Sequence, residues 1–100
     1  MDNIKGALIK ALEGYTGKAF NGYSYLTSSG DQQHFVVTSV GIVQGQRIVN
    51  IGLIVQFVHD TIIIDRDINS KPLVDALVQL GIPREKIILA YAGEPVPELT

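Results

Sequence analysis

The chain contains no cysteine, so it has neither a disulfide framework nor a thiolate metal site. This absence fits a reducing compartment, and we expect a cytoplasmic protein. Charge is also scarce: charged residues make up 18% of the chain, whereas soluble domains usually carry about a quarter. The net charge is −2, and a nonspecific nucleic-acid binder usually has a basic excess instead. Composition therefore argues against autonomous DNA binding.

Long hydrophobic runs are absent too. The longest apolar stretch, residues 48–58, is interrupted by Asn50, Gly52 and Gln56 and is too short to span a membrane. Asp2 stands where a signal peptide would carry basic residues. We therefore expect no membrane segment and no signal peptide.

Apolar side chains, in contrast, are plentiful, with a hydrophobic fraction of 46% in 100 residues. This length predicts a single domain over residues 1–100, with one core that needs no disulfide or metal. Many apolar and few charged side chains leave more apolar surface than a small domain buries. We therefore predict that the chain forms a homo-oligomer.

Apolar residues recur at helical spacing in two places. The first helix is predicted over residues 3–15, with Asp2 or Asn3 as its cap. The second helix begins near residue 73 and carries its apolar stripe on one face. Its predicted cap is Asn69 or Ser70, with Pro72 in the first turn and Gly81 as the stop.

Runs rich in β-branched and aromatic residues predict the strands. The tight turns Gln44-Gly45 and His59-Asp60 join three of them into an antiparallel meander. The last strand is apolar enough to be internal to the sheet. The predicted fold is α+β, an antiparallel sheet of about five strands with both helices packed on one face. The predicted strands are residues 23–27, 34–43, 46–58, 61–67 and 87–91, with residues 18–22 as a connector.

The strand at 46–58 has two different faces if its side chains alternate strictly. One face is wholly apolar and needs a cover of helices, and the other is half apolar. A second chain is expected to meet the half-apolar face. The apolar face carries Val49, Ile51, Leu53, Val55 and Phe57. The predicted interface residues are Ile48, Ile54 and Val58 of the other face, with Val96 and Leu99 of the tail.

Acidic residues suggest one enzymatic alternative. Asp65 and Asp67 lie two apart on a strand, so both are expected to point the same way, and paired carboxylates could hold a divalent ion. Together with Glu85 they would make a small metal-dependent hydrolase. Glu85 and Lys86 are adjacent, however, so the Glu-x-Lys spacing of a metal-dependent nuclease is absent. We favour solvated charges at these positions and predict no metal site.

Histidine and serine offer no clearer chemistry. His34 and His59 are the only histidines, and they lie at the ends of different predicted strands without ligand spacing. Ser28 and Ser29 precede a glycine but lack the Gly-x-Ser-x-Gly elbow of a nucleophile. We therefore predict a protein that is not an enzyme and has no cofactor.

Basic residues around the second helix suggest another alternative, a factor that contacts DNA through a local patch. These residues alternate with acids, so the local field largely cancels and solvated ion pairs are favoured. Tyr23 and Tyr25 could stack on bases, although packing within the strand is the commoner use. The candidate phosphate contacts are Arg66, Lys71, Arg84 and Lys86.

Two segments carry a resemblance to a known family. Residues 73–90, a helix followed by Gly81-Ile82-Pro83, a basic-acidic pair and an apolar strand, resemble the XisI family of cyanobacterial fdxN element excision controlling factor-like proteins. Residues 47–55 resemble the central strand of that family. The short first helix and the meander agree with it.

This resemblance implies an accessory, non-enzymatic role. The family is associated with the programmed excision of a DNA element during heterocyst development, where a separate recombinase exchanges the strands. Its members are commonly paired with a nuclease-like partner, XisH. The resemblance therefore implies a regulatory protein that acts by protein–protein contact and is associated with DNA only indirectly, and it transfers no catalytic residue.

Overall fold

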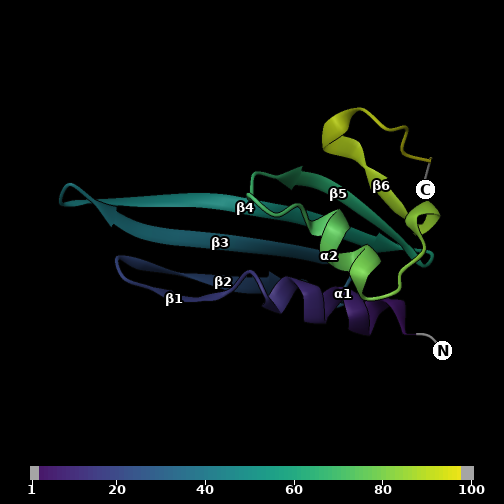
Figure 1. The fold of residues 1–100 in the computed structure, drawn as a ribbon, viewed down its shortest axis with the longest axis horizontal. Helices are drawn as coiled ribbons and strands as arrows, with labels where there is room; N and C mark the ends of the chain where they lie inside the picture. The colour runs from purple at the N-terminus through teal and green to yellow at the C-terminus, as the bar shows by residue number, and fades with distance from the viewer. Residues whose placement is uncertain (1–2, 98–100) are drawn as a thin grey trace.

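The computed structural model describes residues 3–97 and consists of a six-stranded sheet with two α-helices (Figure 1). The strands lie across the sheet in chain order, from β1 to β6. Neighbours from β1 to β5 are antiparallel, and β6 runs parallel to β5. The elements are α1 (Ile4–Glu13), β1 (Gly17–Ala19), β2 (Gly22–Ser28), β3 (His34–Val43), β4 (Gln46–Val58), β5 (Thr61–Asp67), α2 (Leu73–Gln79), the 3-10 turn η1 (Arg84–Lys86), β6 (Ile87–Leu89) and the 3-10 turn η2 (Ala90–Ala92).

The α+β class is confirmed, but the sheet differs from the prediction at both edges. The predicted connector, residues 18–22, contains two of the three residues of β1, and all three pair with β2. The last strand was expected to be internal and antiparallel, yet β6 is an edge strand parallel to β5. The chain crosses over through α2 before it returns to the sheet, and such a crossover joins parallel strands.

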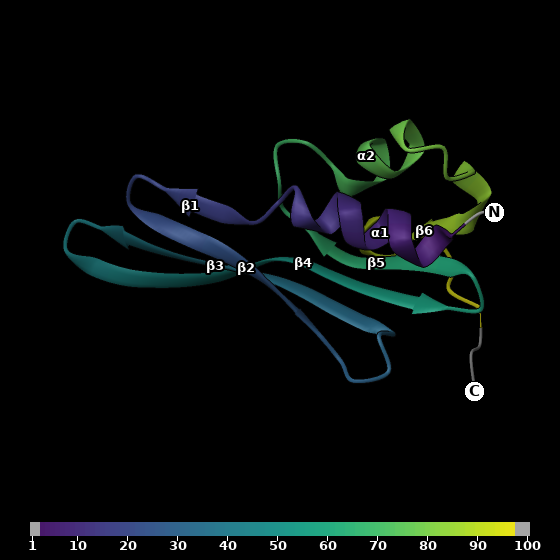
Figure 2. The same ribbon diagram turned by 90° about the horizontal axis from the view of Figure 1, so that it is seen from below.

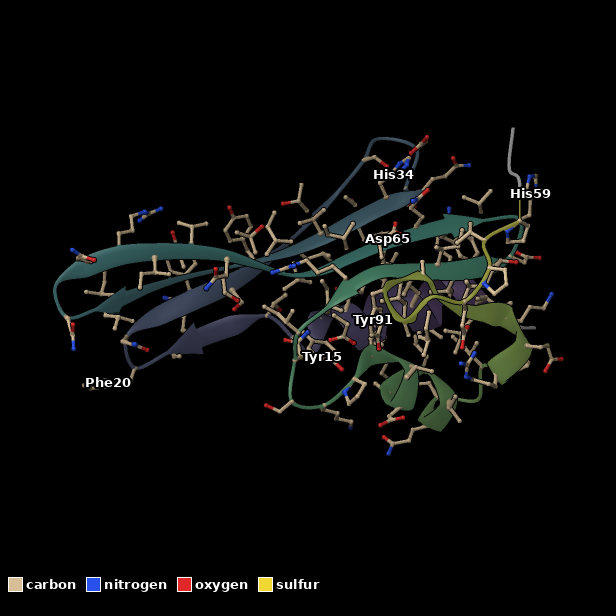
Figure 3. All side chains as sticks on the ribbon, turned by 90° about the horizontal axis from the view of Figure 1, so that it is seen from above. Tyr15, Phe20, His34, His59, Asp65 and Tyr91 are labelled. Atoms are coloured by element: carbon tan, nitrogen blue, oxygen red, sulfur yellow. The ribbon has the colours of Figure 1, made fainter. Side chains whose placement is uncertain are left out.

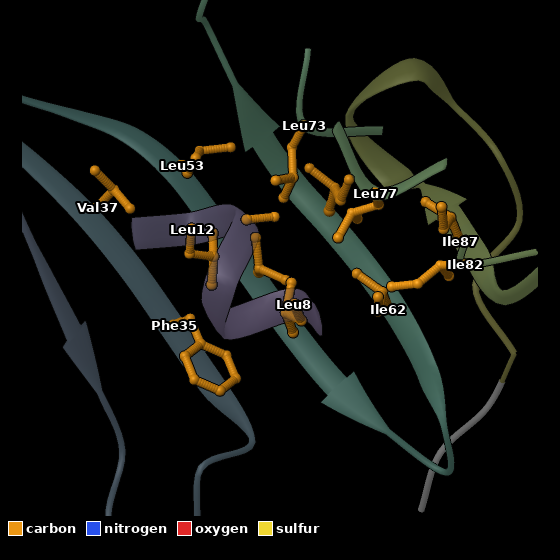
Figure 4. Close-up of a cluster of buried hydrophobic side chains, with 13 residues drawn as sticks. Leu8, Leu12, Phe35, Val37, Leu53, Ile62, Leu73, Leu77, Ile82 and Ile87 are labelled. Atoms are coloured by element: carbon orange, nitrogen blue, oxygen red, sulfur yellow. The ribbon is translucent and has the colours of Figure 1, made fainter. Parts of the chain in front are cut away.

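The hydrophobic core lies between the sheet and the two helices, which cover the same face of it (Figure 2). Leu8 and Leu12 of α1 and Leu73 and Leu77 of α2 are completely buried. They pack against residues of β3, β4, β5 and β6 (Figure 4). Burying one such side chain contributes roughly 1.5–3 kcal/mol, so this cluster is the main source of stability. The strand residues of the cluster are Phe35, Val37, Leu53, Val55, Ile62, Ile64 and Ile87.

The two helices begin differently. Asn3 caps α1 as predicted, since its side-chain oxygen accepts a hydrogen bond from the Gly6 amide at 2.8 Å. The cap predicted at Asn69 or Ser70 is wrong, because the first residue of α2, Leu73, donates its amide to Asp67 Oδ2 at 2.6 Å. A carboxylate at the end of β5 thus satisfies an amide that α2 leaves unpaired.

The tight turns form where they were predicted. Gln44 and Gly45 have φ of 52° and 79°, and His59 and Asp60 have φ of 52° and 58°. Two consecutive residues with positive φ match the right-handed twist of an antiparallel hairpin. These turns set the lengths of β3, β4 and β5.

The helices cover only part of the sheet. The β3–β4 hairpin extends far beyond α1 and α2, accompanied by β1 and the start of β2 (Figures 1 and 2). The molecule is therefore elongated, with extents of 44 × 27 × 26 Å. We call residues 17–25 and 38–51 the arm, and the helix-covered remainder the body.

Candidate interaction surface

A β-bulge at Gly52 decides which side chains of the arm face which way. Val37 pairs with Leu53, but Thr38 pairs with Ile51, so Gly52 is an extra residue in β4. Because β3 pairs with β2 without interruption, β3 itself alternates regularly. Ile51 therefore lies on the face of Thr38, opposite to Leu53. The prediction that Val49 and Ile51 share the helix-covered face with Leu53 is wrong for this reason.

The outer face of the arm, which points away from the helices, carries large apolar side chains. Cross-strand partners lie on one face, so Tyr23, Val40 and Val49 form one row, and Tyr25, Thr38 and Ile51 the next. Val40 is buried in the middle of this layer. The others stay open to solvent, with exposed fractions of 43% for Tyr23, 45% for Tyr25, 52% for Val49 and 40% for Ile51. The two tyrosine rings stack with centroids 6.1 Å apart.

The inner face of the arm, on the side of the helices, carries small and polar residues. Its rows are Gly22, Gly41 and Ile48, then Ser24, Ser39 and Asn50. The two serine hydroxyls are 2.8 Å apart and hydrogen-bonded. Because these side chains are short, a groove of about 440 Å³ remains between the sheet and the segment that joins α1 to β1. The groove is lined mainly by residues 14–19, Asn21, Gly22, Ser24, Ser39, Gly41, Val43, Ile48 and Asn50.

The arm carries no acidic side chain. Of the 8 basic and 10 acidic residues in the chain, only Lys18 and Arg47 belong to it. Both lie on the outer face, since Lys18 pairs with Tyr23 and Arg47 with Ile42. Phe20, in the β1–β2 turn, is fully exposed at the end of the arm (Figure 3). The arm is thus apolar and weakly basic, whereas every acid lies outside it.

Asp65 and Asp67, which were predicted to act as a pair of carboxylates, do not lie on the same face of the sheet. A second bulge leaves Asp65 as an extra residue of β5, because Ile54 pairs with Arg66 and Val55 with Ile64. Asp65 accepts a hydrogen bond from Gln56 on the outer face, 2.8 Å away. Asp67 pairs with Leu53 on the inner face and holds the start of α2. The prediction that both acids point the same way is therefore wrong.

Within residues 3–97, no three His, Asp or Glu side chains lie close enough together to hold a metal ion. His34 and His59 both lie in the body (Figure 3). His34 pairs with Gln56 on the outer face, and His59 occupies the β4–β5 turn. Ser29 is structural, because its hydroxyl donates to Asp31 at 2.6 Å and accepts the His34 amide.

The four basic residues of the predicted phosphate patch fall in three separate places, and three of them bond to protein groups. Arg66 donates from Nε to the Ile51 carbonyl at 2.6 Å on the outer face. Lys71, before α2, donates to Gln79 at 3.3 Å. Arg84 and Lys86 lie in η1, at the other end of α2, where Arg84 forms an ion pair.

That ion pair closes the β6 edge of the sheet. Arg84 donates a hydrogen bond from Nη1 to the Ile87 carbonyl and another from Nη2 to Glu94 Oε2, both at 2.7 Å. The other oxygen of Glu94 accepts the Leu89 amide at 2.8 Å. The Leu89 amide and the Arg84 guanidinium hold the pKa of Glu94 below its usual value. We call this Arg84–Glu94 ion pair with its two backbone hydrogen bonds the clamp. The clamp occupies the Ile87 carbonyl and the Leu89 amide, backbone groups of β6 that an incoming strand would need.

Tyr15 secures the loop between β5 and α2. Tyr15 donates its hydroxyl to the Lys71 carbonyl at 2.7 Å. Burial raises the pKa of both Tyr15 and Tyr91, and the nearby carboxylates Asp67 and Asp75 raise it further. Both phenols therefore stay protonated at neutral pH, and Tyr15 serves as a structural group.

The five predicted interface residues fall in different places. Ile48 lies in the inner groove and is 39% exposed. Ile54 and Val58 are half-buried on the outer face of the body, and Val96 is exposed in the tail. Leu99 lies outside the described residues. The large outer-face side chains of the arm were missed, and the signal that could have found them is Gly52, because a glycine inside a strand often marks a bulge.

A family profile described as XisI protein matches residues 3–100. The chain belongs to the XisI family. No curated protein matches it. Two solved structures from Anabaena variabilis ATCC 29413 share its fold. One is a XisI-like protein that is 20% identical to this chain and superposes with a TM-score of 0.64. The match covers 86% of this chain and 78% of the XisI-like protein. The other is the fdxN element excision controlling factor XisI, which is 22% identical to this chain with a TM-score of 0.54. The match covers 88% of this chain and 81% of the excision controlling factor.

The XisI fold of this chain contains no membrane-crossing candidate in its described part. Neither helix there is long and apolar enough to cross a bilayer. α1 has 10 residues and α2 has 7, whereas a spanning helix needs about 20.

Proposed function

We propose that this XisI-family chain is a non-enzymatic accessory protein that regulates DNA element excision by contact with a nuclease-like protein. Family membership and the fold shared with an excision controlling factor support this role. The single observation that carries it is the arm, which exposes apolar side chains beyond the reach of the helices. Contiguous exposed apolar surface is typical of proteins that bind other proteins.

The inner groove is the proposed site for the nuclease-like partner. The floor of the groove consists of glycines and serines, whose side chains are absent or short. Position 22 requires glycine, because a Cβ there would overlap the Val40 carbonyl oxygen. Ile48 and Val43 provide apolar contacts, and Asn50 and Thr16 provide hydrogen-bonding groups. An open groove that combines a few apolar contacts with hydrogen-bonding groups suits an extended segment or loop of a partner.

Co-purification with an XisH-like protein of the same genome tests this proposal. The two chains would be expressed together, with an affinity tag on the XisH-like protein only. We expect the native chain and Val78→Asp to co-purify, and Ile48→Asp to be lost, because a carboxylate would enter the groove unpaired. Val78 is a matched control, being 45% exposed on α2 in the body. Equal recovery of both variants, or no recovery of the native chain, contradicts the proposal.

Direct DNA contact is a second candidate, supported by the absence of acids from the arm. Lys18 and Arg47 would contact phosphates, and the stacked Tyr23 and Tyr25 would contact bases. Binding of a labelled oligonucleotide would then weaken with salt and with Arg47→Glu. Absence of binding at low salt removes this candidate.

A further inference from the structure

We propose that the edge of β2 at residues 25–28 binds an extended segment of the nuclease-like partner, which joins the sheet there as an additional strand. This inference rests on the proposed function and deepens it by naming the kind of contact, which is main-chain hydrogen bonding. We call residues 25–28 the free edge. The argument uses the backbone groups of this edge and not the apolar outer face of the arm.

The hydrogen bonds of β2 show which of its backbone groups face this edge. At one end the Ile42 amide donates to the Asn21 carbonyl, and at the other end the Ser29 amide donates to the His34 carbonyl, both at 2.9 Å. Between these two bonds β2 pairs with β3 without interruption. In an antiparallel ladder the backbone groups of successive residues point alternately to one neighbour and to the other. The odd-numbered residues of β2 therefore bond to β3, and the even-numbered residues face away from it.

The strand β1 fills only the first part of this outward row. Gly22 and Ser24 are the even-numbered residues that lie opposite β1. Leu26 and Ser28 come next, and within residues 3–97 their amides and carbonyls have no hydrogen-bond partner on that side. Figure 2 looks onto this edge, and no other described segment lies in front of it. Donors and acceptors are thus aligned at the spacing of a strand, and what they lack is the backbone of another strand.

The other edges of the sheet are protected, which sets the free edge apart. At β6 the clamp occupies the backbone groups that an incoming strand would need. At β1 the edge strand has only three residues and carries Lys18, and both features discourage pairing with another chain. Residues 25–28 contain no charge, no proline and no bulge, and Tyr25 and Thr27 are good strand formers. An unprotected edge of this kind is suited to the addition of a strand.

The position of the free edge relates it to the proposed partner site. Ser24 lines the inner groove, and Leu26, the next residue on the same face of β2, begins the free edge. Leu26 also packs against the core, so the edge is held in a fixed position beside the groove. In strand addition, main-chain hydrogen bonds provide affinity, and neighbouring pockets that receive side chains provide specificity. The free edge and the groove would divide these two roles for one partner.

Amide hydrogen exchange tests the pairing residue by residue. The native chain, alone and in its complex with the co-expressed XisH-like protein, would be followed by nuclear magnetic resonance. We expect the Leu26 and Ser28 amides to exchange fast in the free chain and to be slowed roughly tenfold or more in the complex. The Tyr25 and Thr27 amides face β3 and should be protected in both samples. A partner that touched only side chains would not produce this alternation.

Proline and valine at position 28 separate main-chain from side-chain effects. Ser28→Pro removes an outward amide, and an edge strand tolerates proline at such a position. Ser28→Val keeps the amide and is the matched control. We expect Ser28→Pro to raise the dissociation constant for the XisH-like protein by roughly tenfold or more, and Ser28→Val to leave it unchanged. Native affinity in a folded Ser28→Pro overturns the inference, and if this variant does not fold, the exchange pattern decides alone.

The outcomes separate this inference from the proposed function. If the native chain does not co-purify with the XisH-like protein, both are overturned. If it co-purifies and Ile48→Asp is lost, but the Leu26 and Ser28 amides stay unprotected in the complex, the proposed function stands and this inference is overturned. If these amides are already protected in the free chain, and more so at higher protein concentration, a second copy occupies the edge and the inference is again overturned.

Discussion

The body and the arm share the same strands but are built in opposite ways. In the body, β3, β4 and β5 are covered by α1 and α2 over completely buried leucines, and the β6 edge is closed by the Arg84–Glu94 clamp. In the arm the same β3 and β4 continue with no helix above them and with large apolar side chains facing solvent. One sheet thus provides both a stable core and an open surface. Fold stability and partner contact should therefore respond to different substitutions.

The largest effect is expected in the core of the body. Leu12→Ala should lower the free energy of unfolding by about 2–5 kcal/mol, because it removes a completely buried side chain from the α1–sheet contact and leaves a cavity. Urea unfolding followed by circular dichroism measures it. Val49→Ala in the arm is the matched substitution at an exposed position. Equal losses for the two would contradict the division between body and arm.

A smaller effect is expected where the body joins the start of α2. Asp67 accepts the Leu73 amide, the Asn69 amide and the Asn69 side chain within 3.0 Å. Asp67→Ala should cost about 1–3 kcal/mol, because these part-buried donors lose their acceptor. Thermal unfolding measures the loss. Asp65→Ala is the control, since Asp65 makes one exposed contact, and an equal loss in the control would refute a capping role for Asp67.

In the arm, substitution should change association more than folding. Val49→Thr keeps the shape of an exposed strand residue and should shift the stability of a single chain by no more than about 0.5 kcal/mol. Because composition predicts a homo-oligomer, the midpoint of unfolding should nevertheless depend on protein concentration in the native chain and less so in this variant. Unfolding at several concentrations measures both effects. A native midpoint that is independent of concentration would show that the arm contributes nothing through a second copy.

The smallest effect concerns the pH response of the β6 edge. The folded pKa of Glu94 is lower than its unfolded pKa, so its contribution is present above the unfolded pKa and is lost as the pH falls through the folded pKa. Acid should therefore lower the protection factor of the Leu89 amide, which compares its hydrogen exchange with that of an unfolded chain at the same pH. Glu94→Gln should remove this pH dependence, whereas Glu85→Gln on exposed η1 should keep it. An unchanged profile in Glu94→Gln would mean that the clamp does not protect the edge.

Much of the fold could be predicted from local signals in the sequence. Asn3 as the cap of α1, the Gln44-Gly45 and His59-Asp60 turns, and the extents of β3, β4 and β5 follow from short-range preferences. The family resemblance at residues 73–90 and 47–55 is confirmed by the profile match. In contrast, β1 is a three-residue strand that exists only through its pairing with β2, so its own residues carry little signal.

The sequence predicted that the chain exposes an apolar surface, but it did not predict where on the fold that surface lies. An excess of apolar side chains over a small core follows from composition, and the arm exposes that excess. Its position was misjudged because strict alternation was assumed along residues 46–58. The extra residue at Gly52 moves Val49 and Ile51 to the outer face and brings Ile48 into the groove. The extra residue at Asp65 likewise separates it from Asp67.

The sequence by itself determined the family, the α+β class, the main helices and strands, and the surplus of apolar side chains. These depend on local spacing, caps and turns, which each segment carries within itself. Only the tertiary structure decided the faces of the arm, the capping role of Asp67 and the parallel edge at β6. Each of these depends on register between strands, and a register shift of one residue moves every following side chain to the other face.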